Sequence, residues 1–196
     1  MKIIENPRKI RNIHISIYGF LVFLAILSCQ QQNITELDSH VRPIEMLIDI
    51  SDMPNNWNWD YDYDGFPSSW ENDTDYYSDD GASVIFGIEV NGKVFRASHM
   101  IVWFNDEKTA KRKFENEIAP EPHNEIDGWT YKSIIAEDQA LSCGFDDIYN
   151  CKWVIRYGKY ISKFATWIGP DIMSLQEMER IAKVIDEIMR EKLLIP

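Results

Sequence analysis

The sequence predicts an α+β fold: an antiparallel sheet built from hairpins, with helices packed against it, including a long C-terminal helix. Three observations lead to this fold class. Two runs rich in Val, Ile and Phe flank an Asn-Gly pair at residues 91–92, the pair preferred in two-residue hairpin turns. A second pair of such runs flanks a Gly-Lys pair at residues 158–159. The chain closes with an amphipathic helix, residues 174–194, which opens on a Ser-x-x-Glu capping box.

Local patterns predict the other elements. Residues 41–50 are expected to form a short helix, because their apolar side chains share one face at helical spacing. Residues 105–118 are expected to form an amphipathic helix with Asn105 or Asp106 as its N-cap. Runs rich in β-branched and aromatic residues predict strands at residues 82–90, 93–104, 129–136, 139–143, 151–157 and 159–168.

The N-terminus predicts a secretory signal peptide over residues 1–28. Four basic residues precede an apolar run, residues 15–27, which is shorter than the roughly 20 residues of a membrane-spanning helix. The sequence Ile-Leu-Ser-Cys that ends at Cys29 resembles the lipobox of bacterial lipoproteins. The resemblance implies cleavage before Cys29 and acylation of that cysteine. An ordinary signal peptide or an uncleaved anchor is the alternative.

The predicted domain organisation follows from the leader. Residues 29–40 are polar and are expected to form a tether, and residues 41–196 are expected to form one α+β domain. Cys143 and Cys151 are the two cysteines that remain after Cys29. An even pair in an exported protein predicts a disulfide, and two free thiols are the alternative.

Outside the leader the chain is strongly acidic. The full chain has 20 Lys and Arg against 32 Asp and Glu, and the leader holds four of the former and one of the latter, which leaves a net charge of −15. This charge argues against DNA or RNA as a partner. Anionic lipid headgroups would repel the domain, so we expect the lipid on Cys29 to provide the attachment to the membrane.

The most acidic and aromatic part of the domain, residues 57–80, contains a match to the calcium-loop pattern D-x-[DN]-x-[DN]-G-x5-E. Asp60, Asp62 and Asp64 take its first three ligand positions, the carbonyl of Phe66 the fourth, and Glu71 would supply the bidentate carboxylate. Calcium is therefore a candidate cofactor of this segment.

Two other interpretations of the segment compete with the calcium loop. Aromatic and polar residues alternate from Trp57 to Asp64, which predicts a strand with one aromatic and one acidic face. Aspartates on such a strand lie too far apart to surround one ion. An irregular loop is the third interpretation. Two further features argue against a calcium loop: Pro67 cannot donate a backbone hydrogen bond within the loop, and the flanking residues do not have a helical pattern.

The aromatic residues also suggest a ligand. Trp57, Trp59 and Trp70 could stack on sugar rings while nearby carboxylates accept hydrogen bonds from hydroxyl groups, or they could simply cover the sheet. His99 lies on a predicted strand and is interpreted as a packed or edge histidine and not as a ligand. The sequence contains no nucleophile elbow, zinc-protease motif or phosphate-binding loop. A hydrolase that uses two unidentified carboxylates ranks third among the functions considered.

A family resemblance completes the sequence-based interpretation. The segment "MLIDISDMPNNW", the later "FNDEKTAKRKF" and the closing hairpin and helix are similar in order to uncharacterised bacterial lipoproteins with a PsbP/Mog1-like α+β domain. The resemblance implies a fold and supplies no catalytic residue. We therefore expect an exported lipoprotein on the outer face of the cell membrane or on the outer membrane, with a non-catalytic binding or scaffolding role. A calcium-assisted module that binds a ligand such as a glycan is the second expectation.

Overall fold

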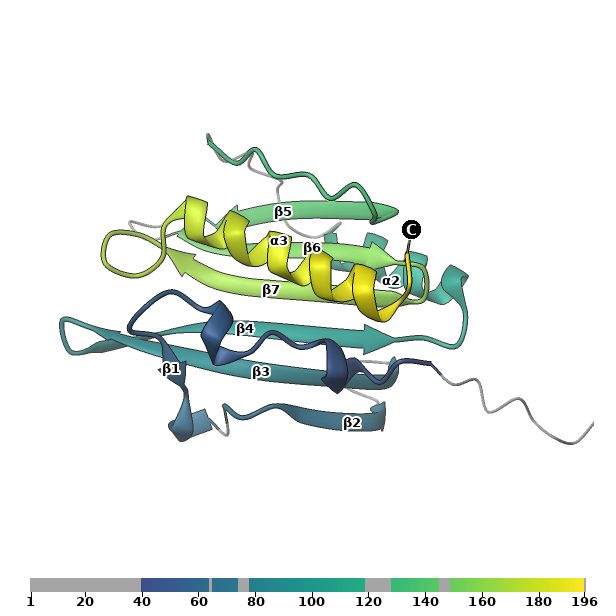
Figure 1. The fold of residues 1–196 in the computed structure, drawn as a ribbon, viewed down its shortest axis with the longest axis horizontal. Helices are drawn as coiled ribbons and strands as arrows, with labels where there is room; N and C mark the ends of the chain where they lie inside the picture. Colours follow the sequence, from purple (N-terminus) through teal and green to yellow (C-terminus); the bar gives the residue numbers. More distant parts are fainter. Residues whose placement is uncertain (1–39, 64, 74–77, 119–127, 145–148, 196) are drawn as a thin grey trace, which may run out of the picture. The chain divides into compact units, whose positions relative to one another are not determined.

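Seven strands form one antiparallel sheet in the computed structural model, in the order β1-β3-β4-β7-β6-β5, with β2 also paired to β3 (Figure 1). The structure describes residues 40–63, 65–73, 78–118, 128–144 and 149–195, and the predicted leader and Cys29 lie outside them. The strands are β1 Asn58–Trp59, β2 Ser68–Asp73, β3 Ser78–Val90, β4 Lys93–Trp103, β5 Asp138–Gly144, β6 Tyr149–Tyr157 and β7 Tyr160–Ile168. The predicted antiparallel sheet is confirmed.

The two predicted hairpins, β3–β4 and β6–β7, are also confirmed. In the first, Asn91 and Gly92 both have positive φ, 52° and 74°, as a type I′ turn requires. This turn fixes the register of β3 and β4, so that Val84 lies opposite His99 and Phe86 lies opposite Ala97. All four of these side chains are buried on one face of the sheet.

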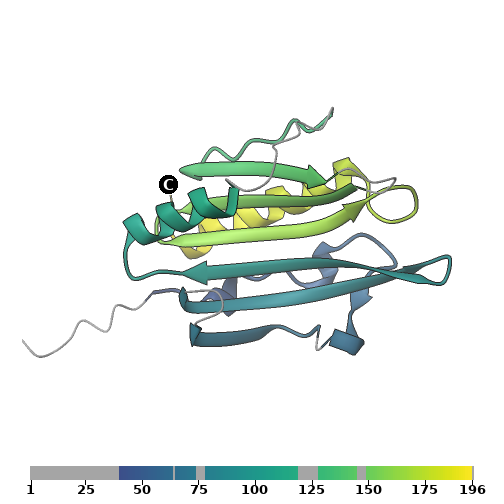
Figure 2. The same ribbon diagram turned by 180° about the vertical axis from the view of Figure 1, so that it is seen from behind.

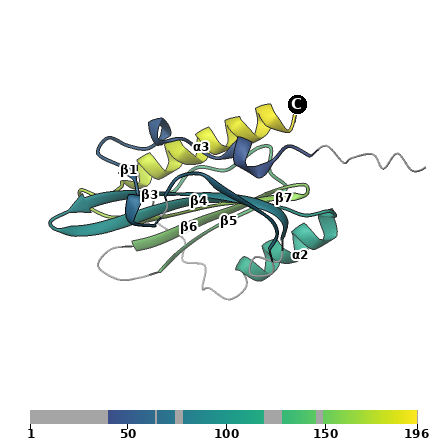
Figure 3. The same cartoon turned by 90° about the horizontal axis from the view of Figure 1, so that it is seen from below.

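The C-terminal helix, α3 (Leu175–Lys192), crosses that face (Figures 1 and 3). Its predicted capping box is present: Ser174 Oγ accepts a hydrogen bond from Glu177 N at 3.2 Å, and the Glu177 carboxylate accepts one from Ser174 N at 2.7 Å. The helix contributes Met178, Ile181, Ala182, Ile185 and Met189 to the main core.

A second helix, α2 (Glu107–Ile118), lies on the opposite face of the sheet (Figures 2 and 3). Asp106 caps it, because its carboxylate accepts hydrogen bonds from Thr109 N and Thr109 Oγ1, both at 2.8 Å. Ala110 and Phe114 pack there in a smaller apolar cluster with residues of β4, β6 and β7. No helix in the described part of the chain is both long and apolar enough to cross a membrane.

The predicted helix at residues 41–50 is wrong. The segment forms two short 3-10 turns, η1 (Pro43–Met46) and η2 (Ile50–Asp52). Of the three residues between them, Leu47 and Asp49 have extended backbone. The cause lies far along the chain: Ile48 N donates a hydrogen bond at 3.1 Å to Nδ1 of His99 on β4. That bond removes Ile48 from any helical ladder and holds the segment on the sheet beside α3 (Figure 1).

The predicted strand at residues 129–136 is also wrong, since the described chain from Gly128 to Glu137 has no regular secondary structure. Side chains accept hydrogen bonds from its backbone N–H groups instead. Glu179 on α3 accepts a hydrogen bond from Tyr131 N at 3.0 Å, and Gln139 accepts one from Ser133 N at 2.9 Å. We call residues 129–137 the α3-side segment.

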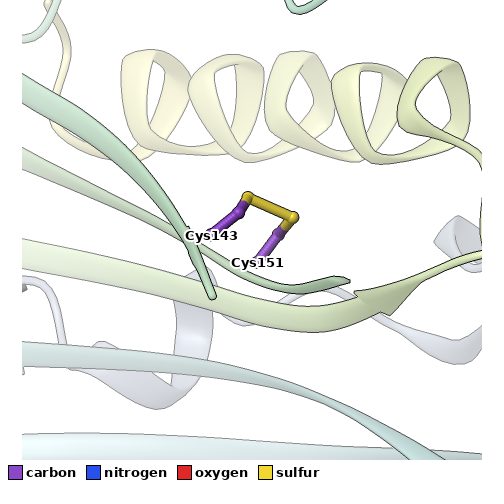
Figure 4. The surroundings of a disulfide bond; sticks show 2 residues. All are labelled: Cys143 and Cys151. Carbon is purple, nitrogen blue, oxygen red and sulfur yellow. A yellow bond between two sulfur atoms is a disulfide. The ribbon is translucent and has the colours of Figure 1, made fainter. Parts of the chain in front are cut away.

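The predicted disulfide between Cys143 and Cys151 is confirmed. The two residues lie directly opposite each other on β5 and β6. Figure 4 shows the bond on the side of the sheet that faces the helix, and both cysteines belong to the main core. The disulfide therefore links the edge strand of the sheet to its neighbour beneath α3.

Candidate functional site

The segment with the calcium-loop match forms a turn at the edge of the sheet. β1 pairs with β3 at Phe86 and Gly87, whereas β2 pairs with β3 between Ser78 and Ser83. Ile85 lies between the two pairings and binds both ends of the intervening chain. Its carbonyl accepts from Asp60 N and its N–H donates to Gly65 O, both at 3.2 Å. We call the described residues Trp59–Tyr63 and Gly65–Phe66 the aromatic turn.

Asp60 organises the backbone of the aromatic turn. Its carbonyl accepts hydrogen bonds from Tyr63 N at 3.2 Å and Gly65 N at 2.8 Å, and its Oδ1 accepts one from Asp62 N at 3.3 Å. Tyr61–Tyr63 consequently form a 3-10 turn, η3. The predicted long aromatic strand is therefore wrong, because only Asn58–Trp59 pair with β3 before the chain turns.

The carboxylate of Asp60 is buried and forms an ion pair with Arg96 on β4. Arg96 lies directly opposite Gly87 on β3, and Gly87 in turn lies opposite Asn58. The guanidinium reaches across β3 to Asp60 at the position of Gly87, where a Cβ would lie 3.5 Å from the side chain of Asp60. The same guanidinium carbon lies 3.9 Å from the centre of the Tyr63 ring, so one cation stabilises both the carboxylate and the ring.

Gly65 allows the chain to close against the sheet. A Cβ atom at this position would lie 2.5–2.6 Å from the backbone atoms Asp60 N, Asp60 O and Ile85 O. We expect Gly65→Ala to lower the free energy of unfolding by about 1–3 kcal/mol, because backbone on both sides must move. Gly144→Ala is the matched control, since a Cβ there meets no atom of the described residues within 4 Å. Equal urea midpoints for the two variants would contradict this account of the turn.

Large aromatic side chains of the turn are exposed to solvent. The exposed fractions are 69% for Tyr61, 60% for Tyr63 and 53% for Phe66. The Phe66 ring lies 5.4 Å from Tyr61, edge to face, and 6.0 Å from Trp59. Trp59 stacks at 5.2 Å on Phe86, which is fully buried. The rings of Phe86, Trp59, Phe66 and Tyr61 therefore form a continuous series from the core to the surface, and the Tyr63 ring packs separately on Arg96.

The tryptophans proposed for ligand stacking occupy different environments. Trp57 is buried and its Nε1 donates to Ile172 O at 3.3 Å, so it covers the core. Trp70 donates to Ser78 Oγ at 3.1 Å and its ring occupies the space above Gly81. Only Trp59 belongs to the aromatic turn. The sequence-based interpretation did not propose the exposed rings of Tyr61, Tyr63 and Phe66 as ligand contacts, although they lie in the same acidic stretch.

The structure does not bring the described calcium-loop residues into one cluster. Asp60 binds Arg96, and Glu71 lies on β2 opposite Asp80. Asp64 lies outside the described residues. In the parts of the chain that the structure describes, no three His, Cys, Asp or Glu side chains gather in a way that could hold a metal ion.

We expect calcium to have little effect on the domain, because Asp60, the first carboxylate of the motif, already has a cationic partner in Arg96. Adding about 1 mM CaCl₂, which is enough to load even weak extracellular calcium modules, should leave the thermal midpoint unchanged. Asp60→Asn should lower the midpoint in the absence of calcium, since it removes the charge that pairs with Arg96. A rise in the midpoint with calcium that Asp60→Asn abolishes would instead establish a metal site.

His99 is a structural residue at the centre of the sheet. It is fully buried; its Nδ1 accepts from Ile48 N at 3.1 Å and its Nε2 lies 2.9 Å from Ser162 Oγ. The bond from Ile48 places the ring proton on Nε2, so Ser162 Oγ accepts it. Burial lowers the pKa of His99 from 6.5 to about 3. The imidazole is therefore neutral at physiological pH and has no access to a substrate.

Comparisons of the chain with protein-family models, with curated protein sequences and with solved structures found no match. The assignment of a functional site therefore depends on the geometry of the aromatic turn and on the sequence of the leader.

Proposed function

We propose that this chain is an exported lipoprotein, held at the cell envelope by acyl chains on Cys29, with a non-catalytic binding role. The basic and apolar leader followed by the lipobox-like sequence supports export and lipidation. The Cys143–Cys151 disulfide supports an oxidising compartment. Two or more acyl chains would hold the domain stably on the membrane surface.

The environment of the buried carboxylates supports a binding role over a catalytic one. Asp60 and Asp186 are buried acids of the described chain. Asp60 is paired with Arg96, and Asp186 accepts hydrogen bonds from the hydroxyl groups of Tyr131 and Tyr157. Both carboxylates therefore hold parts of the fold together, and their oxygen atoms are occupied by protein groups.

The exposed ring stack of the aromatic turn is the observation that carries the proposal. Monomeric proteins expose few clustered aromatic side chains unless these contact a partner. The turn is fixed by hydrogen bonds at Asp60 and Ile85, so little conformational entropy is lost when a ligand binds. It is a preformed contact surface at the open edge of the sheet.

Sugar is the ligand class that we propose for this surface. The exposed faces of Tyr61 and Phe66 can pack on the apolar face of a pyranose ring. The exposed side chains of Asn58, which precedes the turn, and of Asp62, which belongs to it, can bind its hydroxyl groups. An envelope lipoprotein is surrounded by polysaccharide, which gives this chemistry a source at the proposed location.

The anchor is tested by fractionation of cells that express the full chain. We expect the wild-type chain in the membrane fraction and Cys29→Ser in the soluble or unprocessed fraction. Mass spectrometry of the wild-type N-terminus should find Cys29 as the first residue, with acyl chains attached. A Cys29→Ser chain that stays in the membrane at its processed mass would contradict the lipid anchor.

Ligand class is tested by probing a glycan array with the purified full chain, with and without EDTA. We expect signals on a subset of glycans that persist in EDTA. Signals lost in EDTA would support the calcium-assisted alternative. An array without signal would contradict sugar as the ligand and would leave a protein partner as the class to test.

A further inference from the structure

A cavity of about 230 Å³ lies between α3 and the α3-side segment, away from the aromatic turn in the fold. Part of its wall is apolar and consists of Tyr131, Ile134 and Ile135. Ile134 is 91% exposed, which places a large aliphatic side chain at the rim with almost no protein contact. The cavity is partly open to solvent, so a ligand could enter it without unfolding of the segment.

Hydrogen bonds to α3 fix the wall of the cavity. The carboxylate of Glu179 accepts from the backbone N–H groups of Thr130 and Tyr131. Burial raises the pKa of Glu179, but these hydrogen bonds outweigh burial and lower it below its ordinary value. Within the segment, Ser133 Oγ accepts from Ile135 N at 3.3 Å. The cavity is therefore part of the folded structure and does not depend on a ligand to form.

Asp186 lies at the base of the cavity, between two tyrosine hydroxyl groups. Tyr131 donates to its Oδ2 and Tyr157 donates to its Oδ1. Burial and the negative charge of Asp186 raise the pKa of both tyrosines above the ordinary value of 10, so both remain donors at neutral pH. Both oxygens of this carboxylate thus accept a hydrogen bond from the protein, which makes Asp186 less available to a cationic ligand than an unbound carboxylate would be.

The remaining charges around the cavity favour an anion. Lys132 comes from the segment, and Lys183 and Arg190 come from α3. Lys183 Nζ lies 5.7 Å from the centre of the Tyr131 ring. Glu187 is the other acidic residue of the lining, so the three cations exceed the two carboxylates by one. Glu179 on α3 removes this difference, because its carboxylate lies close enough to Lys183 to interact with it. The cations around the cavity then equal the carboxylates in number, in a chain whose net charge is −12.

We propose that this cavity binds a small organic anion, a carboxylate with a short aliphatic or aromatic group. The carboxylate binds between Lys183 and Arg190 and the apolar group packs on Tyr131 and Ile135. The volume lies below the roughly 300–1,000 Å³ of pockets that enclose drug-sized ligands, which restricts the ligand to a small molecule. This site is independent of the aromatic turn and of its proposed sugar ligand.

Three probes that share a phenylalkyl group and differ in the charge of their head group test the proposal: 4-phenylbutyrate, 4-phenylbutanol and 4-phenylbutylamine. Each is titrated into the full chain and followed by amide chemical shifts and by tryptophan fluorescence. Trp153 can report binding because its ring lies 5.9 Å from that of Tyr131. We expect the carboxylate to bind with a dissociation constant of about 1 mM, a value usual for so small a ligand, and the amine not to bind.

A pair of matched variants locates the site. Lys183→Gln/Arg190→Gln should weaken the binding of 4-phenylbutyrate at least about fivefold. The control, Lys93→Gln/Lys108→Gln, removes the same charge from two exposed positions elsewhere and should leave this binding unchanged. The alcohol or the amine binding as tightly as the carboxylate would overturn the proposal. The proposal would also be overturned if both double variants weakened the binding of 4-phenylbutyrate equally. The same holds if the amide chemical shifts of Tyr131 and Ile135 did not change at 10 mM 4-phenylbutyrate.

Discussion

Replacing His99 with leucine is expected to lower the free energy of unfolding by about 2–5 kcal/mol at pH 7, because it leaves two buried groups without a partner. These groups are Ile48 N–H and the hydroxyl of Ser162, which bind opposite sides of the imidazole. The first of them joins the η1–η2 segment to the sheet. Loss of this contact should therefore release the segment that covers the core beside α3.

Urea unfolding at pH 7 measures this effect. Ser98→Ala, on the neighbouring position of β4 and half-buried on the other face, is the control and should change the free energy by less than about 0.5 kcal/mol. Hydrogen exchange should show faster exchange at Ile48 in His99→Leu. A loss below about 1 kcal/mol in His99→Leu would contradict the structural role of the imidazole.

The same histidine predicts how stability depends on pH. The pKa of His99 is about 3 in the folded chain and near its ordinary value of 6.5 when unfolded, so the unfolded state takes up the proton first. Its contribution to stability is complete above pH 6.5 and is lost as the pH falls toward 3. At pH 5 this loss is about 2 kcal/mol. The wild-type chain should lose that much more stability between pH 7 and pH 5 than His99→Leu loses.

Breaking the Cys143–Cys151 disulfide is expected to have an effect of similar size. Cys143→Ala/Cys151→Ala should lower the free energy of unfolding by about 2–5 kcal/mol, as is typical of native disulfides in small exported domains. The bond restricts the unfolded chain, and the two sulfur atoms also fill the core beneath α3. β5 has a strand neighbour only in β6, so this edge should separate first.

Reduction separates the disulfide from other effects of the substitutions. Dithiothreitol should lower the urea midpoint of the wild-type chain and leave that of the double alanine variant unchanged. An unchanged wild-type midpoint under reducing conditions would mean that the bond is absent in solution or contributes nothing to stability.

Local sequence signals predicted the parts of the fold that depend on neighbouring residues. The Asn-Gly turn at residues 91–92 and the Ser174–Glu177 capping box act within four residues, and both are present. Alternation of apolar residues likewise predicted the buried face of β3, since Val84, Phe86 and Ile88 all lie in the core.

The predictions failed where a distant side chain determines the backbone. His99 is 51 residues from Ile48, and its hydrogen bond replaces the expected helix at residues 41–50. Arg96 is 36 residues from Asp60, so the acidic stretch gave no sign that its first aspartate has a cationic partner. With that pair in place, the described residues of the alternating aromatic and acidic stretch form a turn, and the carboxylate of Asp60 binds Arg96.

The same limitation applies to the cavity at α3. Tyr131 and Tyr157 are 55 and 29 residues from Asp186, and no pattern in the sequence relates the three. From the sequence alone, the basic residues of α3 are expected only to form the solvent-exposed side of an amphipathic helix. The structure adds the α3-side segment that faces them.

Calorimetric titration of the strongest array glycan into the wild-type chain and into Tyr61→Ala/Phe66→Ala tests the binding role of the aromatic turn most directly. Both side chains are more than half exposed, so the variant should keep the wild-type thermal midpoint. Val94→Ala, which changes an exposed apolar residue outside the turn, is the control. We expect the double variant to bind at least about tenfold more weakly and the control to bind as the wild type does. Equal affinity of the double variant and the wild-type chain would contradict the aromatic turn as the binding surface.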